Sequence, residues 1–284
     1  LQVGVLKAAS LDVFETEPAR DNPLFEAENF IATPHLGAST TEAQEKVALQ
    51  VAEQMADYLT TGAVTNAINM ASVSAEEAPI LKPYMNLGAL LGRFLGQTDL
   101  PELNTIKLEF DGKAAGLNEQ PVLASTLAGL LGAQMDSVNM VNAATIASSK
   151  GIAVATVRHD RRCDYETLLR LSVSYGGSER SLAGTLVGGD MPRLIEVQGI
   201  SIESDFPENM LYLRNYDKPG FIGTLGTLMG ELGLNIATFH LGRKQAGGEA
   251  VALIEIDGAV DKQTLGAIRA LPQIVRADYL RFAS

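Results

Sequence analysis

The order of predicted elements near the C-terminal end of the chain is the feature that most restricts its fold. Four short segments there have the apolar content of strands, and two longer ones have the apolar spacing of helices. Pro219 is a favoured first helical residue, and Gly247-Gly248 forms a turn between two strands. The predicted strands are 210–215, 235–241, 250–256 and 274–282, and the predicted helices are 219–232 and 261–270. The order βαββαβ predicts a ferredoxin-like domain, in which two helices cover one face of an antiparallel sheet.

A group of polar residues follows the first of these strands. Asn215 and Asp217 precede Pro219-Gly220, and Asn235 opens the next strand, where it can face them. Polar side chains beside a helix N-terminus suit the binding of a carboxylate. The alternative for these residues taken alone is a capped turn that only stabilises the helix.

The N-terminal residues have the pattern of the end of an α/β unit. Short apolar runs at 8–14 and 29–33 predict strands, which the polar loop 15–28 separates. A turn at Pro34-His35-Leu36-Gly37 leads into a predicted helix that ends at Gly62. Ser39 and Glu42 have the spacing of a capping box at the start of this helix. An apolar residue recurs every four positions along it, at Ala43, Val47, Val51, Met55 and Leu59.

His35 is the candidate for acid–base chemistry in this region. The positive end of the following helix favours a neutral imidazole, and a nearby carboxylate favours the protonated form. A histidine balanced between these influences suits general acid–base catalysis. A lone histidine with no further context more often has a structural or surface role.

The central part of the chain predicts a separate α+β domain. Residues 63–79 are small and polar, which is typical of a domain boundary, and an amphipathic helix follows from Ile80 to Leu95. The predicted strands are 103–110, 152–158, 167–175, 181–187 and 193–197, and the predicted helices are 121–133 and 139–150. We therefore expect three domains, at residues 1–65, 66–207 and 208–284.

Charge and cysteine content exclude several classes of function. A net charge of −12 disfavours binding to nucleic acid. The single cysteine, Cys163, excludes an internal disulfide and a cysteine-rich zinc site, and no metal site is predicted. The mixed run Arg158–Arg162 could bind an anion, as a substrate- or anion-regulatory domain would, but such a run is more typical of a solvated turn. No apolar run has the length of a membrane span and no signal peptide opens the chain, so the expected location is the cytoplasm.

Two linked motifs resemble those of a known enzyme family. Residues 11–18 (LDVFETEP) and 33–40 (TPHLGAST) resemble the C-terminal signatures of the D-2-hydroxyacid dehydrogenases, the second most closely those of the phosphoglycerate branch. The resemblance implies that His35 removes the proton of the substrate hydroxyl while a hydride passes to NAD, and that Glu17 orients His35 and raises its pKa. It also implies that Asp12 contacts the nicotinamide carboxamide and that the turn formed by His35, Leu36, Gly37 and Ala38 lies against the nicotinamide and its ribose.

The C-terminal domain resembles an ACT domain, the amino-acid-sensing module, in its serine-binding form. The resemblance assigns Asn215, Asp217 and Asn235 to an L-serine effector, with Asp217 on the ammonium group and the asparagines on the carboxylate and hydroxyl. It also implies that ACT domains associate, so that the protein is a homo-oligomer.

The order of the three parts resembles the long phosphoglycerate dehydrogenases. The implied fold is a multidomain α/β and α+β protein: the end of a Rossmann-type unit, an intervening domain and an ACT domain. The implied reaction is the NAD-dependent oxidation of 3-phospho-D-glycerate to 3-phosphohydroxypyruvate in serine synthesis, restrained by serine.

Two parts of that machinery do not occur in this sequence. There is no G-x-G-x-x-G run, the nearest being Gly220-x-x-Gly223-x-x-Gly226, and we find no substrate-binding arginine matching that of the family. The chain begins in mid-pattern, which indicates truncation, and we expect it to be inactive alone. The alternatives are a non-enzymatic amino-acid-sensing or oligomerisation module, and a dehydrogenase for another 2-hydroxy acid.

Overall fold

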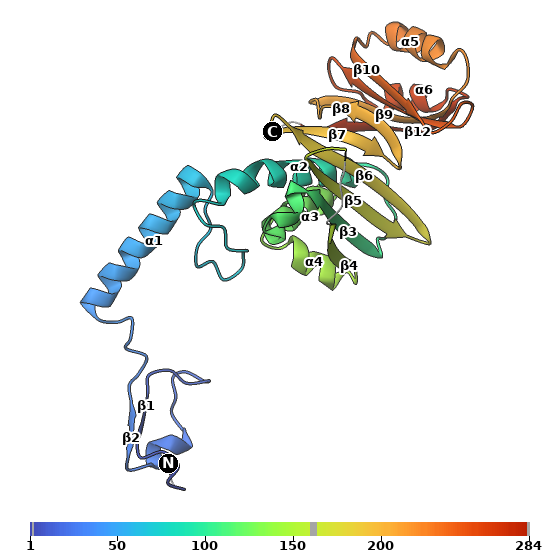
Figure 1. Cartoon of the computed structure of the whole chain (residues 1–284). Helices are drawn as coiled ribbons and strands as arrows, with labels where there is room; N and C mark the ends of the chain where they lie inside the picture. The colour runs from blue at the N-terminus through green and yellow to red at the C-terminus, as the bar shows by residue number, and fades with distance from the viewer. Residues whose placement is uncertain (2, 160–163, 283–284) are drawn as a thin grey trace. The chain divides into compact units, whose positions relative to one another are not determined.

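The computed structural model describes residues 1, 3–159 and 164–282. They form two compact units, Leu1–Thr61 and Gly62–Ser284 (Figure 1). Cys163 and the last three residues of the run 158–162 lie outside the described residues. The boundaries of the three expected domains stay a prediction.

The first unit is built on a short parallel strand pair. Strand β1 (Ala9–Leu11) pairs with β2 (Phe30–Ala32), with Ala9 opposite Phe30. The connection between them contains a 3₁₀ turn, Pro23–Glu26. A helix, α1 (Thr41–Thr61), follows β2, and Val47, Val51, Met55 and Leu59 of its apolar stripe are exposed.

The start of α1 differs from the prediction by one residue. Thr40, not Ser39, caps the helix, since its Oγ1 accepts a hydrogen bond of 3.2 Å from the amide of Ala43. The predicted capping box is therefore wrong. Glu42 instead forms an ion pair of 2.6 Å with Lys46, one helical turn onward.

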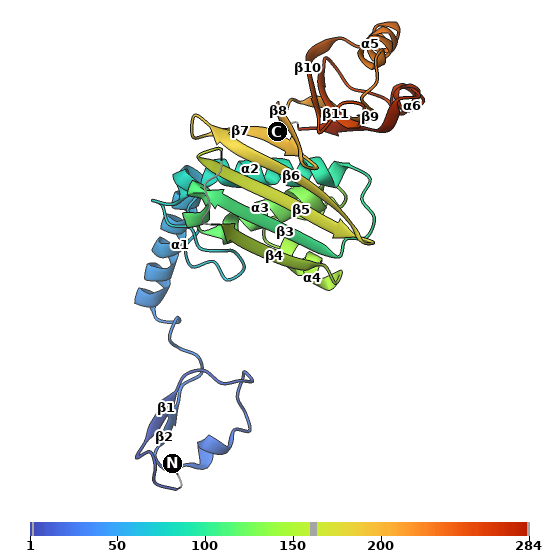
Figure 2. The same cartoon turned by 45° about the vertical axis from the view of Figure 1, so that its right-hand side comes forward.

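The second unit contains a sheet of strand order β4-β3-β5-β6-β7-β8 (Figure 2). Its pairings are antiparallel except for the parallel pair β3–β4. The strands are β3 (Thr105–Gly112), β4 (Ala153–His159), β5 (Thr167–Tyr175), β6 (Ser178–Val187), β7 (Met191–Val197) and β8 (Ile200–Ser204). Helices α2 (Ala78–Gln97), α3 (Glu119–Gly132) and α4 (Ala143–Ser149) lie on one face of this sheet, which confirms the predicted helices. Strand β8 was not predicted, because it contributes only two apolar residues.

Helices α2 and α3 cross at backbone contact. Gly88, Gly92 and Gly96 recur every four residues on the side of α2 that faces α3. A β-carbon on Gly92 would lie 2.2 Å from the carbonyl oxygen of Thr126, and one on Gly96 would lie 2.2 Å from that of Leu130. The glycines are therefore required by the close approach of the two helices.

The C-terminal part has the predicted βαββαβ order. Its elements are β9 (Asn209–Tyr216), α5 (Phe221–Glu231), β10 (Ile236–Arg243), β11 (Glu249–Ile256), α6 (Lys262–Arg269) and β12 (Ile274–Arg281). The strand order β10-β11-β9-β12 is antiparallel throughout. The residues of one sheet face, among them Leu211, Leu213 and Ile254, pack with Leu225 of α5 and Ile268 of α6. The multidomain α/β and α+β fold class is confirmed.

The opposite face of this sheet shares a core with the preceding domain. Phe94 of α2 is fully buried, and its ring centroid lies 5.2 Å from that of Tyr212 on β9. Burial raises the pKa of Tyr212 to about 12, and its hydroxyl accepts a hydrogen bond of 3.2 Å from Gln198. The buried residues of this sheet face are Met210, Tyr212, Val251, Leu253, Leu280 and Phe282. The ACT-like sheet is thus buried on both faces.

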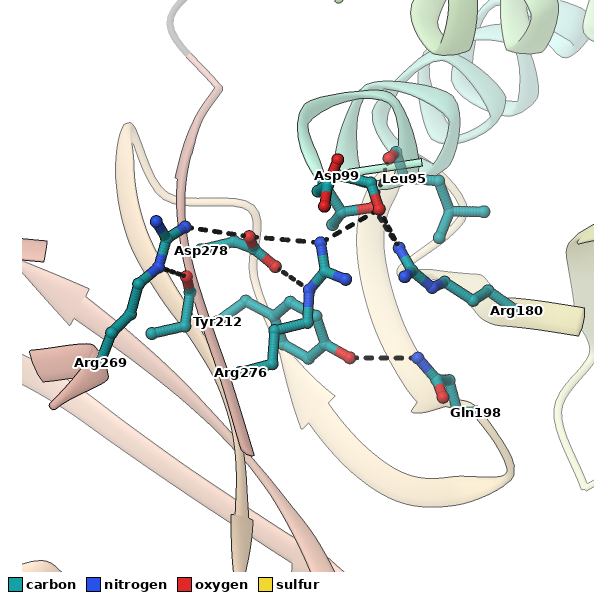
Figure 3. Close-up of polar contacts among 10 residues, drawn as sticks. Leu95, Asp99, Arg180, Gln198, Tyr212, Arg269, Arg276 and Asp278 are labelled. Carbon is teal, nitrogen blue, oxygen red and sulfur yellow. Dashed lines mark hydrogen bonds and ion pairs between the residues drawn. The ribbon is translucent and has the colours of Figure 1, made fainter. Parts of the chain in front are cut away.

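A polar network borders this shared core (Figure 3). Asp278 of β12 is 5% exposed, and its carboxylate accepts a hydrogen bond from Arg276 and lies 3.6 Å from a guanidinium nitrogen of Arg269. Arg276 and Arg180 of β6 both donate to the carbonyl of Asp99, at 3.4 and 2.8 Å. That carbonyl follows the C-terminal end of α2, where the helix dipole favours cations. The arginines therefore connect β12 to both α2 and β6.

Candidate functional site

The predicted catalytic residues lie at one edge of the β1–β2 pair. Asp12 directly follows β1, and Thr33 and His35 follow β2. Because the two strands are parallel, their carboxyl ends meet at the same edge. This is the edge at which open α/β sheets bind ligands.

His35 and Glu17 are in direct contact. Nδ1 of His35 lies 2.7 Å from Oε2 of Glu17, and the other carboxylate oxygen accepts a hydrogen bond of 3.0 Å from the amide of Phe14. The hydrogen bond that His35 donates to Glu17, and then the charge of Glu17, raise the pKa of His35, while the same bond lowers the pKa of Glu17. With Nδ1 held by Glu17, Nε2 is left to exchange a proton with a substrate.

Asp12 organises the turn that carries His35. Its carboxylate accepts hydrogen bonds from the amides of Leu36, at 2.7 Å, and Gly37, at 2.8 Å, and from the hydroxyl of Thr33. The Thr33 bond first, and then these amides, lower the pKa of Asp12. Its main-chain carbonyl also accepts from the amide of His35, at 2.9 Å. This positioning role was not foreseen from the sequence, which assigned Asp12 to the cofactor.

A cavity of about 490 Å³ lies beside the pair and has mostly apolar walls. The rings of Phe14 and Phe25 meet edge to face, with centroids 5.4 Å apart. The lining residues are Asp12, Phe14, Glu17, Pro18, Ala19, Phe25, Ala32, Thr33, Pro34 and His35. Neither phenylalanine was predicted to line a site: Phe14 lies within the motif 11–18, and Phe25 lies in the loop that separates the two strands.

Replacing Glu17 with glutamine is expected to lower the pKa of His35 toward the ordinary histidine value. The charge and the strong acceptor that stabilise the imidazolium would both be lost. Proton NMR titration of the His35 ring measures the change. Glu15→Gln is the matched control, because Glu15 is exposed and lies outside the cavity lining. A titration midpoint that is equal in Glu17→Gln and the parent chain would show that the two side chains do not interact.

The second candidate site lies between the N-terminal end of α5 and the β10–β11 turn. Asp217 accepts hydrogen bonds there from Arg243 and, at 3.0 Å, from the amide of Gly247, and that amide first, then Arg243, lower its pKa. Asn215 is 1% exposed, and among the described residues its side-chain oxygen has no hydrogen-bond partner. Asn215, Asp217 and Arg243 line one cavity of about 540 Å³.

Asn235 does not lie with the other two predicted effector residues. It precedes β10 and donates a hydrogen bond of 2.6 Å to Asp257, at the opposite end of the sheet from Asp217. Within a single chain, therefore, Asn235 does not face Asn215 and Asp217, and that expectation is wrong. Arg243, at the other end of β10, takes that place. It was missed because the hairpin register brings it there, and a register is not visible in a local motif.

Comparisons with known proteins agree with this order of parts. The model of the D-isomer-specific 2-hydroxyacid dehydrogenase NAD-binding domain matches residues 1–37, that of the D-3-phosphoglycerate dehydrogenase intervening domain matches residues 80–198, and that of the ACT domain matches residues 209–273. The first match contains Glu17 and His35, and the last contains Asp217, Asn235 and Arg243.

Three relatives are D-3-phosphoglycerate dehydrogenases. Those of Methanocaldococcus jannaschii and Bacillus subtilis are 34% and 32% identical over 96% and 97% of this chain, and over 52% and 53% of their own lengths. That of Synechocystis is 34% identical over 94% of this chain and 49% of its own length. The chain thus spans about half the length of the curated relatives it matches. Among the described residues, no helix has the length and apolarity needed to cross a membrane.

Proposed function

Because the chain belongs to the D-3-phosphoglycerate dehydrogenase family and carries that family's C-terminal part, we propose that it supplies the acid–base pair for NAD-dependent oxidation of 3-phospho-D-glycerate to 3-phosphohydroxypyruvate. The observation that carries this proposal is the 2.7 Å contact between His35 and Glu17 at the carboxyl edge of β1 and β2. The reaction would feed serine synthesis in the cytoplasm.

The chemistry assigned to His35 follows from its protonation state. Glu17 accepts a hydrogen bond from Nδ1–H, so the neutral ring presents the lone pair of Nε2 to the substrate hydroxyl. His35 takes the hydroxyl proton as the carbonyl forms, and Glu17 stabilises the resulting imidazolium. NAD, when bound, accepts the hydride that leaves the same carbon. His35 returns the proton in the reverse direction.

The residues that would hold the nicotinamide end of NAD are those of the turn after β2. Asp12 fixes the backbone of Leu36 and Gly37, and there is little room for a side chain at Gly37, where a β-carbon would lie 3.2 Å from Asp12. Such a turn presents backbone rather than side chains to a flat ring. The phosphates and adenosine would be held by groups that this sequence does not contain.

The ACT-like domain is assigned to an L-serine effector, held by Asn215, Asp217 and Asn235. Strand β10 is at the sheet edge, so the β10 strands of two copies can pair antiparallel. Such pairing would bring the start of β10 in one copy toward the end of β10 in the other, and so Asn235 of one copy toward Asp217 of the other. The site would then exist only in a homo-oligomer joined through its ACT domains.

The assay that tests the proposed reaction uses a chimera in which the part of the Bacillus subtilis relative preceding the match is joined to residue 1. We expect the chimera to produce NADH from 3-phospho-D-glycerate, and the 284-residue chain alone to produce none. D-lactate and D-glycerate serve as competing substrates, and faster turnover of either would assign another 2-hydroxy acid. A folded chimera that binds NAD and turns over no 2-hydroxy acid would favour the non-enzymatic sensing module instead.

A further inference from the structure

The C-terminal end of strand β10, with the residue that follows it, contacts different parts of the molecule on its two sides. Successive side chains of a strand point to opposite faces of the sheet. Gly242 and Lys244 thus share one side, toward β8, and Arg243 is on the other, in the cavity with Asp217. Three consecutive residues therefore reach both the effector cavity and the intervening domain.

On the cavity side, the charges match a ligand that carries both signs. Asp217 and Arg243 neutralise one another, and the ammonium group of Lys218, which also lines the cavity, lies 5.8 Å from the centre of the Tyr216 ring. A zwitterion can dock antiparallel on such an ion pair, with its ammonium on Asp217 and its carboxylate on Arg243. The guanidinium has donors to spare for a second carboxylate. The unpartnered oxygen of Asn215 then gains a donor from the ligand.

On the other side, β10 is in backbone contact with the intervening domain. A β-carbon on Gly242 would lie 2.6 Å from the carbonyl oxygen of Ser201 on β8, so the backbones of the two strands approach too closely for a larger residue at this position. The ammonium group of Lys244 lies 3.0 Å from the position of a β-carbon on Gly199, in the β7–β8 turn.

The β7–β8 turn is itself part of an ion-pair network. Glu196, at the end of β7, pairs with Arg170 of β5. Arg170 first, and to a smaller degree the amide of Gly199 and the charge of Lys244, lower the pKa of Glu196. A movement of Lys244 would therefore change the field at a partly buried ion pair on the sheet of the intervening domain.

We propose that Arg243 binds the carboxylate of the amino-acid effector and that Lys244 transmits this binding to the β7–β8 turn of the intervening domain. The proposal rests on the amino-acid-sensing role proposed above for the same cavity. Binding draws Arg243 toward the ligand, and the adjacent residue moves with it because both belong to one strand end. The β7–β8 turn is then the first element of the intervening domain to respond.

Calorimetric titration of the 284-residue chain with L-serine and the other L-α-amino acids tests whether Arg243 binds the carboxylate of the effector. We expect Arg243→Gln to weaken binding at least tenfold, because a charge-assisted contact is lost. Arg243→Lys keeps the positive charge but lacks the paired N–H donors of the guanidinium, so it should weaken amino-acid binding several-fold. This variant replaces Arg243→Gln in the test if Arg243→Gln does not fold. Arg214→Gln is the matched control, because Arg214 forms a comparable ion pair with Glu249 outside the cavity.

Hydrogen–deuterium exchange, measured with and without the amino acid that binds, tests whether Lys244 transmits binding to the β7–β8 turn. In the parent chain, ligand should slow exchange both in the 244–248 turn and in residues 198–204. In Lys244→Gln, affinity should be unchanged, and only the 244–248 turn should be protected. Protection of 198–204 that persists in Lys244→Gln would overturn the transmission role.

Failure of this inference differs from failure of the proposed effector role. If the parent chain binds no amino acid, the effector assignment fails and the inference fails with it. If the parent chain binds an amino acid and Arg243→Gln binds it equally well or more tightly, only the inference fails. In the second case Arg243 would merely compete with the ligand for Asp217.

Discussion

Alanine at Gly92 is expected to destabilise the second unit by about 2–3 kcal/mol or more, whereas alanine at Gly226 should stabilise it by about 0.5–1 kcal/mol. The new β-carbon at Gly92 would lie 2.2 Å from the carbonyl oxygen of Thr126 and 2.8 Å from the amide nitrogen of Leu130. Both atoms are backbone of α3 and cannot rotate away, so the two helices would have to separate. At Gly226, in the middle of α5, a β-carbon meets nothing within 4 Å.

Urea unfolding followed by circular dichroism measures both effects. Both substitutions replace glycine with alanine in a helix, so both gain the same helix preference for alanine. Opposite changes in the free energy of unfolding would therefore report the close contact between α2 and α3. A typical domain has only about 5–15 kcal/mol of total stability, so the loss at Gly92 is readily measured. A stabilised Gly92→Ala chain would mean that α2 and α3 are farther apart than the structure places them.

The sequence pattern predicted the elements of the second unit well because most of them carry a clear period. It could not predict which elements meet across long separations. Gly88, Gly92 and Gly96 form a visible stripe on α2, yet nothing in their spacing identifies α3 as the partner. The reciprocal hydrogen bonds that were predicted for Ser39 and Glu42 occur instead between Ser74 and Glu77, at 3.1 and 3.2 Å, in the turn before α2. A short motif can recur by chance, and only the backbone decides which copy forms its hydrogen bonds.

The sheet of the ACT-like domain shows a similar limit. The apolar run Met210–Leu213 indicates a strand that is buried on both faces. Helices α5 and α6 account for the face of Leu211 and Leu213, and the sequence leaves the occupant of the other face open. In the structure that face is covered by α2 and β8, through residues 94, 200 and 202. The same long-range packing brings Lys244 to the β7–β8 turn.

The candidate catalytic pair was predicted from its motif, and its supporting residues were not. Glu17 and His35 stand eighteen positions apart, and only the parallel pairing of β1 with β2 explains their contact. Asp12 was predicted to contact the nicotinamide carboxamide. In the structure its carboxylate accepts hydrogen bonds from the amides of Leu36 and Gly37, and so fixes the turn that follows β2. A side chain that acts on backbone amides leaves no periodic signal.

In the chimera with the Bacillus subtilis N-terminal part, His35→Asn is expected to lower kcat by about 10²- to 10⁴-fold. Asparagine occupies similar space, but its amide cannot accept the hydroxyl proton. The KM for NAD should change little, because the substitution removes a proton acceptor rather than a cofactor contact. An equal loss of kcat in Glu15→Gln would instead indicate that the whole segment tolerates no change.

The pH profile separates a catalytic His35 from a merely structural one. Oxidation requires the neutral ring, and Glu17 raises the pKa of His35 above its ordinary value near 6.5. The rate of oxidation should therefore rise as pH increases through that raised pKa, and the reverse reduction should fall over the same interval. Glu17→Gln lowers the pKa, so both midpoints should move to lower pH while the plateau rate of oxidation also falls. A structural histidine would leave the midpoints in place, because folding and not proton transfer would then set the rate.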